Sequence, residues 1–295
     1  MSTEARWVPG PTDVARAASR LAEAASIEIG SVDFEDFSRG RQHMRPGQRV
    51  YVSHLPGQTW KRTFEMCARI SGAGLDPVPH VPVRLIRDEP DLRRILGAAI
   101  DAGVREPLLI SGDYPKPLGA FSAVAEVLAT GALQARGFTR VSLAGHPEGH
   151  PRVPWDVICE AQVEKWRLAQ GGGLQVTFVT QFFFAIDPFV HWARFLRASG
   201  VEARLVAGVA GPAGLGRLIK LAARCGVGAS VRALTSRPAS FVKLLDDHAA
   251  EPLLLDLGVE MLHQPGLFDG LHVFSLGGFL RTAAWLREYH PGRAR

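Results

Sequence analysis

A glutamate flanked by isoleucines, in the run Ser26-Ile27-Glu28-Ile29, has the type and setting that most directly suggest chemistry. Side chains alternate along a strand, so two isoleucines facing a hydrophobic layer would leave the Glu28 carboxyl group on the opposite side. Burial there would raise its pKa and suit it to general acid catalysis. The alternative is a strand-end carboxylate paired with an arginine, and this residue alone favours neither.

A loop with two histidines forms a second candidate: residues 145–151 read Gly-His-Pro-Glu-Gly-His-Pro. Three residues separate His146 from His150, a spacing that on a helix would suit a zinc ion, but the prolines exclude that helix. Cys67, Cys159 and Cys225 lie far apart in the sequence, which is typical of a reducing compartment. We therefore predict no metal site and no disulfide framework.

Two further polar motifs follow apolar runs. In Ser111-Gly112-Asp113, a glycine would let a flat ligand approach the backbone, and Asp113 could accept hydrogen bonds from an amino-pyrimidine edge. The commoner explanation of a lone Gly-Asp pair is a strand-to-helix turn. In the run 180–184, Thr-Gln-Phe-Phe-Phe, the Gln181 amide both donates and accepts, so it could bind a heterocycle edge. The phenylalanines would form a flat wall beside it or belong to the core.

The elements that must position these residues alternate between short apolar runs and longer segments of helical periodicity. Such alternation predicts parallel strands with right-handed crossovers, either as a (β/α)8 TIM barrel or as an open doubly wound sheet. The count of eight favours the closed barrel. The expected strands are Ser26–Ile29, Arg49–Ser53, Pro77–Arg84, Pro107–Ser111, Arg140–Ala144, Gln175–Gln181, Ala203–Ala207 and His272–Leu276. The expected helices are Asp13–Ala24, Thr59–Gly72, Asp91–Ala102, Phe121–Thr130, Trp155–Ala169, Asp187–Ala198, Leu215–Arg224 and Ala239–Leu262.

Length and composition fit this architecture. The 295 residues are 46% hydrophobic and carry a formal charge of +5, which is enough for one barrel domain over residues 1–295. The segment 232–270 exceeds the length of one crossover and predicts an extra helical element. No run of basic residues interleaved with aromatics suggests a nucleic-acid partner, and no signal peptide or membrane-spanning run is evident. We expect a cytoplasmic protein.

Five motifs in order resemble the methylenetetrahydrofolate reductase family. The loop 145–151 is similar to the family sequence G-Y-P-E-G-H-P, and residues 180–184 match T-Q-x-F-F. Residues 26–29 resemble S-F-E-F, the pair Pro79-His80 resembles the P-H of the third strand, and residues 111–113 resemble R-G-D. Order and spacing agree from about residue 25 to residue 227.

The resemblance implies a (β/α)8 barrel with FAD across its mouth and folate above the flavin. Glu28 would be the general acid that opens the ring of 5,10-methylenetetrahydrofolate, giving an iminium ion that accepts hydride from the reduced flavin. Asp113, Gln181 and Phe183 would bind the folate. The residues expected along FAD are Ser53, His54, His80, Gly112, Asp113, His146, His150 and Arg167. NAD(P)H or another donor would reduce the flavin, and a homo-oligomer in one-carbon metabolism is expected.

Departures from the family pattern leave an alternative open. His54 and His146 stand where the family has tyrosines, and Ser111 stands where arginine is usual. Near the last strand, residues 276–278 read Leu-Gly-Gly and lack the family's Asn-Arg pair. The alternative is a folate-binding barrel that has lost flavin or catalysis and acts as an accessory protein. A barrel of unrelated chemistry is a third interpretation.

Overall fold

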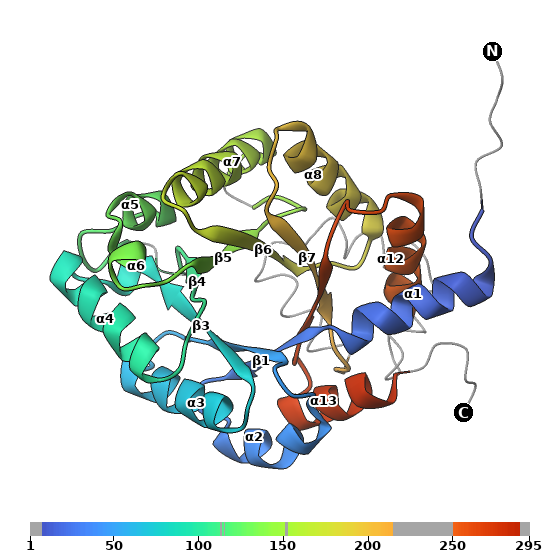
Figure 1. Ribbon diagram of the computed structural model, residues 1–295, viewed down its shortest axis with the longest axis horizontal. Coiled ribbons are helices and arrows are strands. Elements are labelled where there is room, and N and C mark those ends of the chain that lie inside the picture. Colours follow the sequence, from blue (N-terminus) through green and yellow to red (C-terminus); the bar gives the residue numbers. More distant parts are fainter. Residues whose placement is uncertain (1–7, 113, 115, 151–152, 215–249, 290–295) are drawn as a thin grey trace.

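Eight parallel strands close into a barrel with the strands in sequence order, β1 to β8. The structure is a computed structural model that describes residues 8–112, 114, 116–150, 153–214 and 250–289. Helices surround the barrel when it is viewed along its axis (Figure 1). The predicted (β/α)8 fold is confirmed, because β1 pairs with both β2 and β8. An open doubly wound sheet is thereby excluded.

Each of the eight predicted strands is present, with small shifts at the ends. The third strand ends at Pro82 rather than at Arg84, because the chain turns there into the short 3-10 helix η2. The seventh continues to Ala210, three residues further than predicted. The strands are β1 (Ser26–Gly30), β2 (Arg49–Ser53), β3 (Asp76–Pro82), β4 (Leu108–Ile110), β5 (Arg140–Gly145), β6 (Gln175–Phe182), β7 (Arg204–Ala210) and β8 (Gly270–Phe274).

Two of the longer helices, α3 and α4, begin at a side-chain cap. The Thr59 side chain accepts a hydrogen bond from the Arg62 amide, and Asp88 accepts one from Asp91. The helices are α1 (Pro11–Glu23), α2 (Phe34–Gly40), η1 (Arg41–His43), α3 (Trp60–Gly72), η2 (Val83–Leu85), α4 (Glu89–Asp101), α5 (Val124–Ala129), α6 (Ala132–Ala135), α7 (Trp155–Gly171), α8 (Ile186–Ala198), α12 (Glu251–His263) and α13 (Phe279–Glu288).

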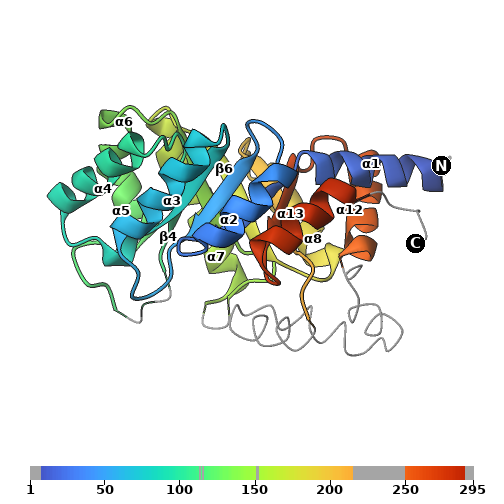
Figure 2. The same ribbon diagram turned by 90° about the horizontal axis from the view of Figure 1, so that it is seen from below.

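Several helices differ from the prediction. The short helices α2, α6 and α13 were not predicted, since seven, four and ten residues give little periodicity. The predicted helix Leu215–Arg224 lies outside the described residues. Of the extra helical element expected over 232–270, the described part contains α12. Gly258 lets α12 approach α1, because a Cβ there would lie 2.9 Å from the Val14 carbonyl oxygen. Figure 2 shows these two helices side by side at one end of the molecule.

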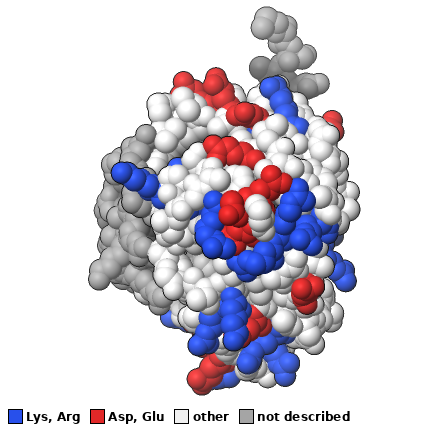
Figure 3. Space-filling view, turned by 90° about the vertical axis from the view of Figure 1, so that its left-hand side faces the viewer, with Lys and Arg blue, Asp and Glu red and all other residues white. Residues whose placement is uncertain are grey.

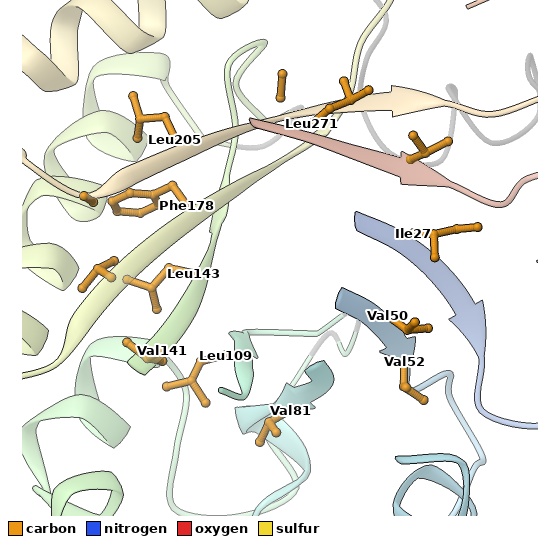
Figure 4. Close-up of a cluster of buried hydrophobic side chains, with 14 of the residues drawn as sticks. Ile27, Val50, Val52, Val81, Leu109, Val141, Leu143, Phe178, Leu205 and Leu271 are labelled. Carbon is orange, nitrogen blue, oxygen red and sulfur yellow. The ribbon is translucent and has the colours of Figure 1, made fainter. Parts of the chain in front are cut away.

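Strand side chains alternate between the helices and the barrel interior. Ile27 and Ile29 are fully buried and belong to the large core beneath the helices. Figure 4 shows this layer, in which apolar side chains from the strands point away from the barrel axis. A smaller cluster fills the interior, formed by Tyr51, Val78, Leu108, Val179 and Val206. Because Glu28 lies between the two isoleucines, its side chain enters the interior, as predicted.

Charged residues lie on the outer surface of the helical layer. Along α4, Arg93 pairs with Glu89 and Arg94 pairs with Asp91 at 2.7 Å. Figure 3 shows the face that includes α4, where basic and acidic side chains are interspersed. Among the described residues, no helix has the length and hydrophobicity required to cross a bilayer.

Candidate active site

Glu28 lies inside the barrel between two histidines. Its Oε2 atom is 3.6 Å from Nε2 of His80, on β3, and 3.6 Å from Nε2 of His272, on β8. The Glu28 side chain is 20% exposed, but Oε2 itself is buried and accepts no hydrogen bond among the described residues. The neighbouring strands β1 and β8, together with β3, which pairs with neither, thus bring three polar side chains together.

The charge state of Glu28 differs from the expectation. Burial raises the pKa of its carboxyl group, but His80 and His272 lower it more, so the pKa lies below its usual value. Burial also lowers the pKa of His80, by more than the neighbouring carboxylate raises it. The prediction of a raised pKa was therefore wrong, because a single strand gives no information about residues across the barrel. In the protein without ligand, Glu28 is a carboxylate at neutral pH.

His272 was missed by the sequence analysis. Its Nδ1 lies 2.9 Å from the Ser26 hydroxyl, which donates in turn to the Leu271 carbonyl. The Tyr51 ring packs against the imidazole at a centroid distance of 4.6 Å. A signal was present in the sequence, because His272 lies between Leu271 and Val273 just as Glu28 lies between two isoleucines.

His54, at the C-terminal end of β2, is held by α3. Its Nδ1 lies 2.7 Å from the Thr63 hydroxyl, and its ring stacks on Trp60 with centroids 4.4 Å apart. Burial, with a smaller contribution from His80, lowers the pKa of His54 to about 4. The neighbouring Ser53 donates its hydroxyl to the Ile29 carbonyl at 3.2 Å. His54 is therefore a neutral imidazole at physiological pH.

A second neutral imidazole, His146, follows β5 and lies beside Gln181. Burial and the Lys165 ammonium lower the pKa of His146 to about 4, although interaction with Gln181 opposes the shift. His150, in the same loop, forms a backbone bridge with Val153. Burial also lowers the pKa of Lys165 to about 8.

The cation near this loop is therefore Lys165, rather than Arg167 as expected. Arg167 is exposed on α7. Residues two positions apart in an α-helix, such as Lys165 and Arg167, point about 200° apart around the helix axis. When one of them faces the barrel, the other therefore faces away. The structure thus brings Lys165 of α7 close to His146, whereas Arg167 lies on the exposed side of the same helix.

Gly112 follows β4 with φ of +86°, a left-handed conformation that favours glycine. A Cβ there would lie 3.0 Å from Cβ of Pro82 and 3.1 Å from the Tyr114 ring. Pro82 and Tyr114 thus occupy the space that a side chain at residue 112 would need. Asp113, predicted to bind both folate and flavin, lies outside the described residues.

Phe183 does not lie where the folate wall was expected. It is fully buried beneath the helices and stacks on Phe189 at 5.1 Å. Its sequence neighbours belong to a separate cluster, in which Phe182 contacts Phe184 and Phe274. We call the rings of Phe182 and Phe184, which follow Gln181 in the sequence, the aromatic surface.

The segment after β8 also departs from the family pattern. Gly278 has φ of +107°, which disfavours an arginine at this position, and a Cβ on Gly277 would overlap the Pro212 carbonyl oxygen. The backbone here is therefore built for glycine.

Several buried polar atoms at this end of the barrel have no hydrogen-bond partner among the described residues. Such atoms are costly unless a ligand satisfies them, and their donor and acceptor chemistry fits a polar heterocycle. No three His, Cys, Asp or Glu side chains in the described part are arranged to hold a metal ion. The unpaired atoms are Glu28 Oε2, His54 Nε2, His80 Nε2, His146 Nδ1 and Gln181 Oε1.

Comparisons of the sequence with known proteins match one family. A family model described as methylenetetrahydrofolate reductase matches residues 52–264. Methylenetetrahydrofolate reductase 2 of Saccharomyces cerevisiae is 25% identical over 138 residues, 44% of this chain and 22% of that protein. The 5,10-methylenetetrahydrofolate reductase of Pectobacterium carotovorum is 26% identical over 140 residues, 46% of this chain and 44% of that protein. These matches span less than half the length of either relative.

A solved structure from Toxoplasma gondii ME49, the apo form of a protein described as a deoxyribose-phosphate aldolase, has a similar fold. The TM-score is 0.50 with 11% identity, covering 93% of this chain and 98% of that one. At this identity the similarity concerns the fold alone.

Proposed function

This chain belongs to the methylenetetrahydrofolate reductase family, and from that premise we propose that it is a flavin-dependent oxidoreductase. It would interconvert 5,10-methylenetetrahydrofolate and 5-methyltetrahydrofolate. The observation that carries the proposal is the buried Glu28 carboxylate, whose Oε2 faces two imidazoles and has no hydrogen-bond partner among the described residues. A buried ionisable group of this kind costs stability unless it is used.

The residues at the barrel mouth fit an FAD. Neutral His54 and His146 each present one unpaired ring nitrogen, and Gly112 carries no side chain at the end of β4. We propose that these residues, with Ser53, His80, His150 and Asp113, line the isoalloxazine and its linker. Lys165 would attract the phosphates in the role first expected for Arg167. Bound flavin would supply the hydride.

The protein's own contribution is to hold and deliver a proton. Because the Ser26 hydroxyl donates to the Leu271 carbonyl, His272 donates from Nδ1 to Ser26 and, when neutral, faces Glu28 with the lone pair of Nε2. A proton shared between Glu28 and His272 therefore lies on the Glu28 carboxyl group or on Nε2. When the flat pterin ring displaces water from the site, desolvation favours the neutral carboxylic acid, which would protonate the folate nitrogen as the ring opens.

Folate would bind against Gln181 and the aromatic surface of Phe182 and Phe184. The Gln181 amide can donate to and accept from the pterin edge, and its Oε1 is unpaired among the described residues. We propose Asp113 as a second pterin contact. NAD(P)H or another donor would reduce the flavin, and a homo-oligomer remains our expectation.

The first test is the absorption spectrum of the purified protein before and after adding FAD. We expect the visible bands of an oxidised flavin to survive desalting. Anaerobic addition of 5-methyltetrahydrofolate should then bleach them, while folic acid should not.

A colourless protein that takes up no FAD would contradict the proposal. If that protein still bound 5-methyltetrahydrofolate, the accessory folate-binding function would replace it. That alternative is favoured by His54 and His146 in place of tyrosines and by the glycine backbone at residues 277–278.

A further inference from the structure

A cavity of about 350 Å³ opens at the N-terminal end of the barrel, which we call the base. Its walls come from the first residues of four strands and from the end of α1. The lining residues are Glu23, Ala24, Ser26, Arg45, Pro46, Gly47, Gln48, Arg49, Tyr51, Arg204, Val206, Asp269, Gly270 and Leu271. This volume is in the range of small-molecule sites, about 300–1,000 Å³.

The base cavity lies at the opposite end of the barrel from the mouth, although Ser26 and Tyr51 of its lining contact His272. The interior cluster that contains Val78, Leu108 and Val179 fills the barrel between the two ends. Gln181 lies two residues beyond Val179 on β6, toward the mouth, whereas Arg204 lies two residues before Val206 on β7, toward the base. A ligand in the base cavity would not touch the proposed flavin site.

Two of the three arginines in the lining lack a carboxylate partner among the described residues. Arg49 pairs with Glu106 at 3.1 Å and with Asp76 at 3.8 Å. Arg45 donates to the Glu23 carbonyl oxygen, a neutral group, and Arg204 has no ion pair or hydrogen bond in the described part. Positive charge is thus left without direct compensation.

The acidic residues of the lining do not remove this excess. Asp269 is already paired with Arg197 at 3.2 Å and accepts the Leu205 amide at 2.8 Å. Glu23 supplies one negative charge against the two positive charges of Arg45 and Arg204. The cavity therefore presents guanidinium donors together with the polar side chains of Ser26 and Gln48.

We propose that the base cavity binds a compact oxyanion with two negative charges, of the phosphate monoester or dicarboxylate class. The planar fork of a guanidinium group matches both phosphate and carboxylate oxygens. Arg45 and Arg204 supply the two forks, and the Tyr51 ring closes the inner end of the cavity. Burial and the Glu106 carboxylate raise the pKa of the Tyr51 hydroxyl, so it stays neutral and does not repel the anion.

The test is calorimetric titration of the full chain with inorganic phosphate and, separately, with succinate, at constant ionic strength. We expect one saturable site for at least one of these probes. Arg45→Gln and Arg204→Gln should each weaken binding about 10-fold, since each removes one charge-assisted contact. Phosphate binding alone would indicate a phosphate-bearing ligand, and succinate binding alone would indicate a dicarboxylate.

Two matched variants locate the site. Arg93→Gln, on the outer face of α4, and Lys165→Gln, at the mouth, should each leave the titration unchanged. Unfolding temperatures of all four variants would show that a loss of binding does not come from loss of the fold.

Two results would overturn the inference: no saturable binding of either probe, or binding that Lys165→Gln removes and Arg204→Gln does not. FAD uptake reports on the mouth alone, so failure of the base site and failure of the proposed oxidoreductase are distinguishable.

Discussion

The barrel interior holds one buried glutamate at each end, and their surroundings differ. At the base, the Glu106 Oε1 atom accepts the Ser142 hydroxyl at 2.7 Å, and Oε2 lies 3.1 Å from the Arg49 guanidinium. At the mouth, the Glu28 Oε2 atom faces only His80 and His272, both at 3.6 Å.

The two glutamates differ in how the protein compensates the buried carboxylate. At the base, Glu106 lies among full cations: its Oε2 atom forms ion pairs with Arg49 and Arg140, although it forms no hydrogen bond among the described residues. Arg140 also approaches Asp76, and the Tyr51 hydroxyl lies 3.1 Å from that of Ser142. The mouth leaves its buried polar atoms unpaired among the described residues. Unsatisfied buried groups persist where a ligand completes them.

The largest expected effect is on activity at the mouth. Glu28→Gln should lower kcat for folate turnover about 10²–10⁴-fold, the usual contribution of a general acid. Reduction of the flavin by its own donor should persist, because that half-reaction needs no proton from Glu28. The measurement is stopped-flow kinetics of the two half-reactions, followed separately. Unchanged folate turnover would remove Glu28 from its proposed role.

Phe183 and Phe184 are adjacent in the sequence, but Phe183 lies in the core and Phe184 lies at the mouth. Phe183→Ala should lower the free energy of unfolding by about 3–5 kcal/mol, because it empties a buried site against Phe189. Phe184→Ala, half-buried at the mouth, should cost much less stability and instead weaken folate binding. Urea denaturation and folate titration of the two variants measure this contrast. Equal stability losses would contradict the assignment of the two side chains to different regions.

Substitution of Glu106, at the base, should lower stability and leave the site at the mouth intact, the opposite of the effect expected for Glu28. Glu106→Gln should destabilise the protein by about 3 kcal/mol, because Arg49 and Arg140 lose a buried counter-charge. FAD affinity should stay unchanged in this variant, while Glu28→Gln should not destabilise the fold. The check is urea denaturation with FAD binding measured on the same samples. A Glu106→Gln protein that lost FAD binding but kept its stability would contradict the different roles assigned to the two glutamates.

The smallest effect concerns pH. His146 has a folded pKa of about 4, below its usual value, so the unfolded chain binds a proton that the folded chain refuses. Stability should therefore be fully present above about pH 6.5 and fall as the pH drops toward 4. His146→Gln should reduce the difference in unfolding free energy between pH 4.5 and pH 7 by about 2 kcal/mol. Chemical denaturation at both pH values tests this, and an unaltered slope would contradict it.

Sequence periodicity was sufficient for the eight strands, because strands covered on both faces appear as short apolar runs. It was weaker for α2 and α6, whose few residues give little periodicity. Motif resemblance identified the mouth and the family, since the motifs follow strand ends that a barrel brings together. Alternation along a single strand already placed Glu28 in the interior, between Ile27 and Ile29.

Contacts between side chains on different strands could not be predicted from local sequence. His80 lies on β3 and His272 is 244 residues from Glu28 in the sequence, and only closure of the barrel brings both imidazoles to the carboxyl group and lowers its pKa. The packing of α7 against the barrel likewise determines that Lys165, and not Arg167, lies near the mouth. Contact with Phe189 of α8 places Phe183 in the core. Local sequence determined the elements and the inward direction of their side chains, whereas charge state and site membership depend on distances between elements that only the tertiary structure sets.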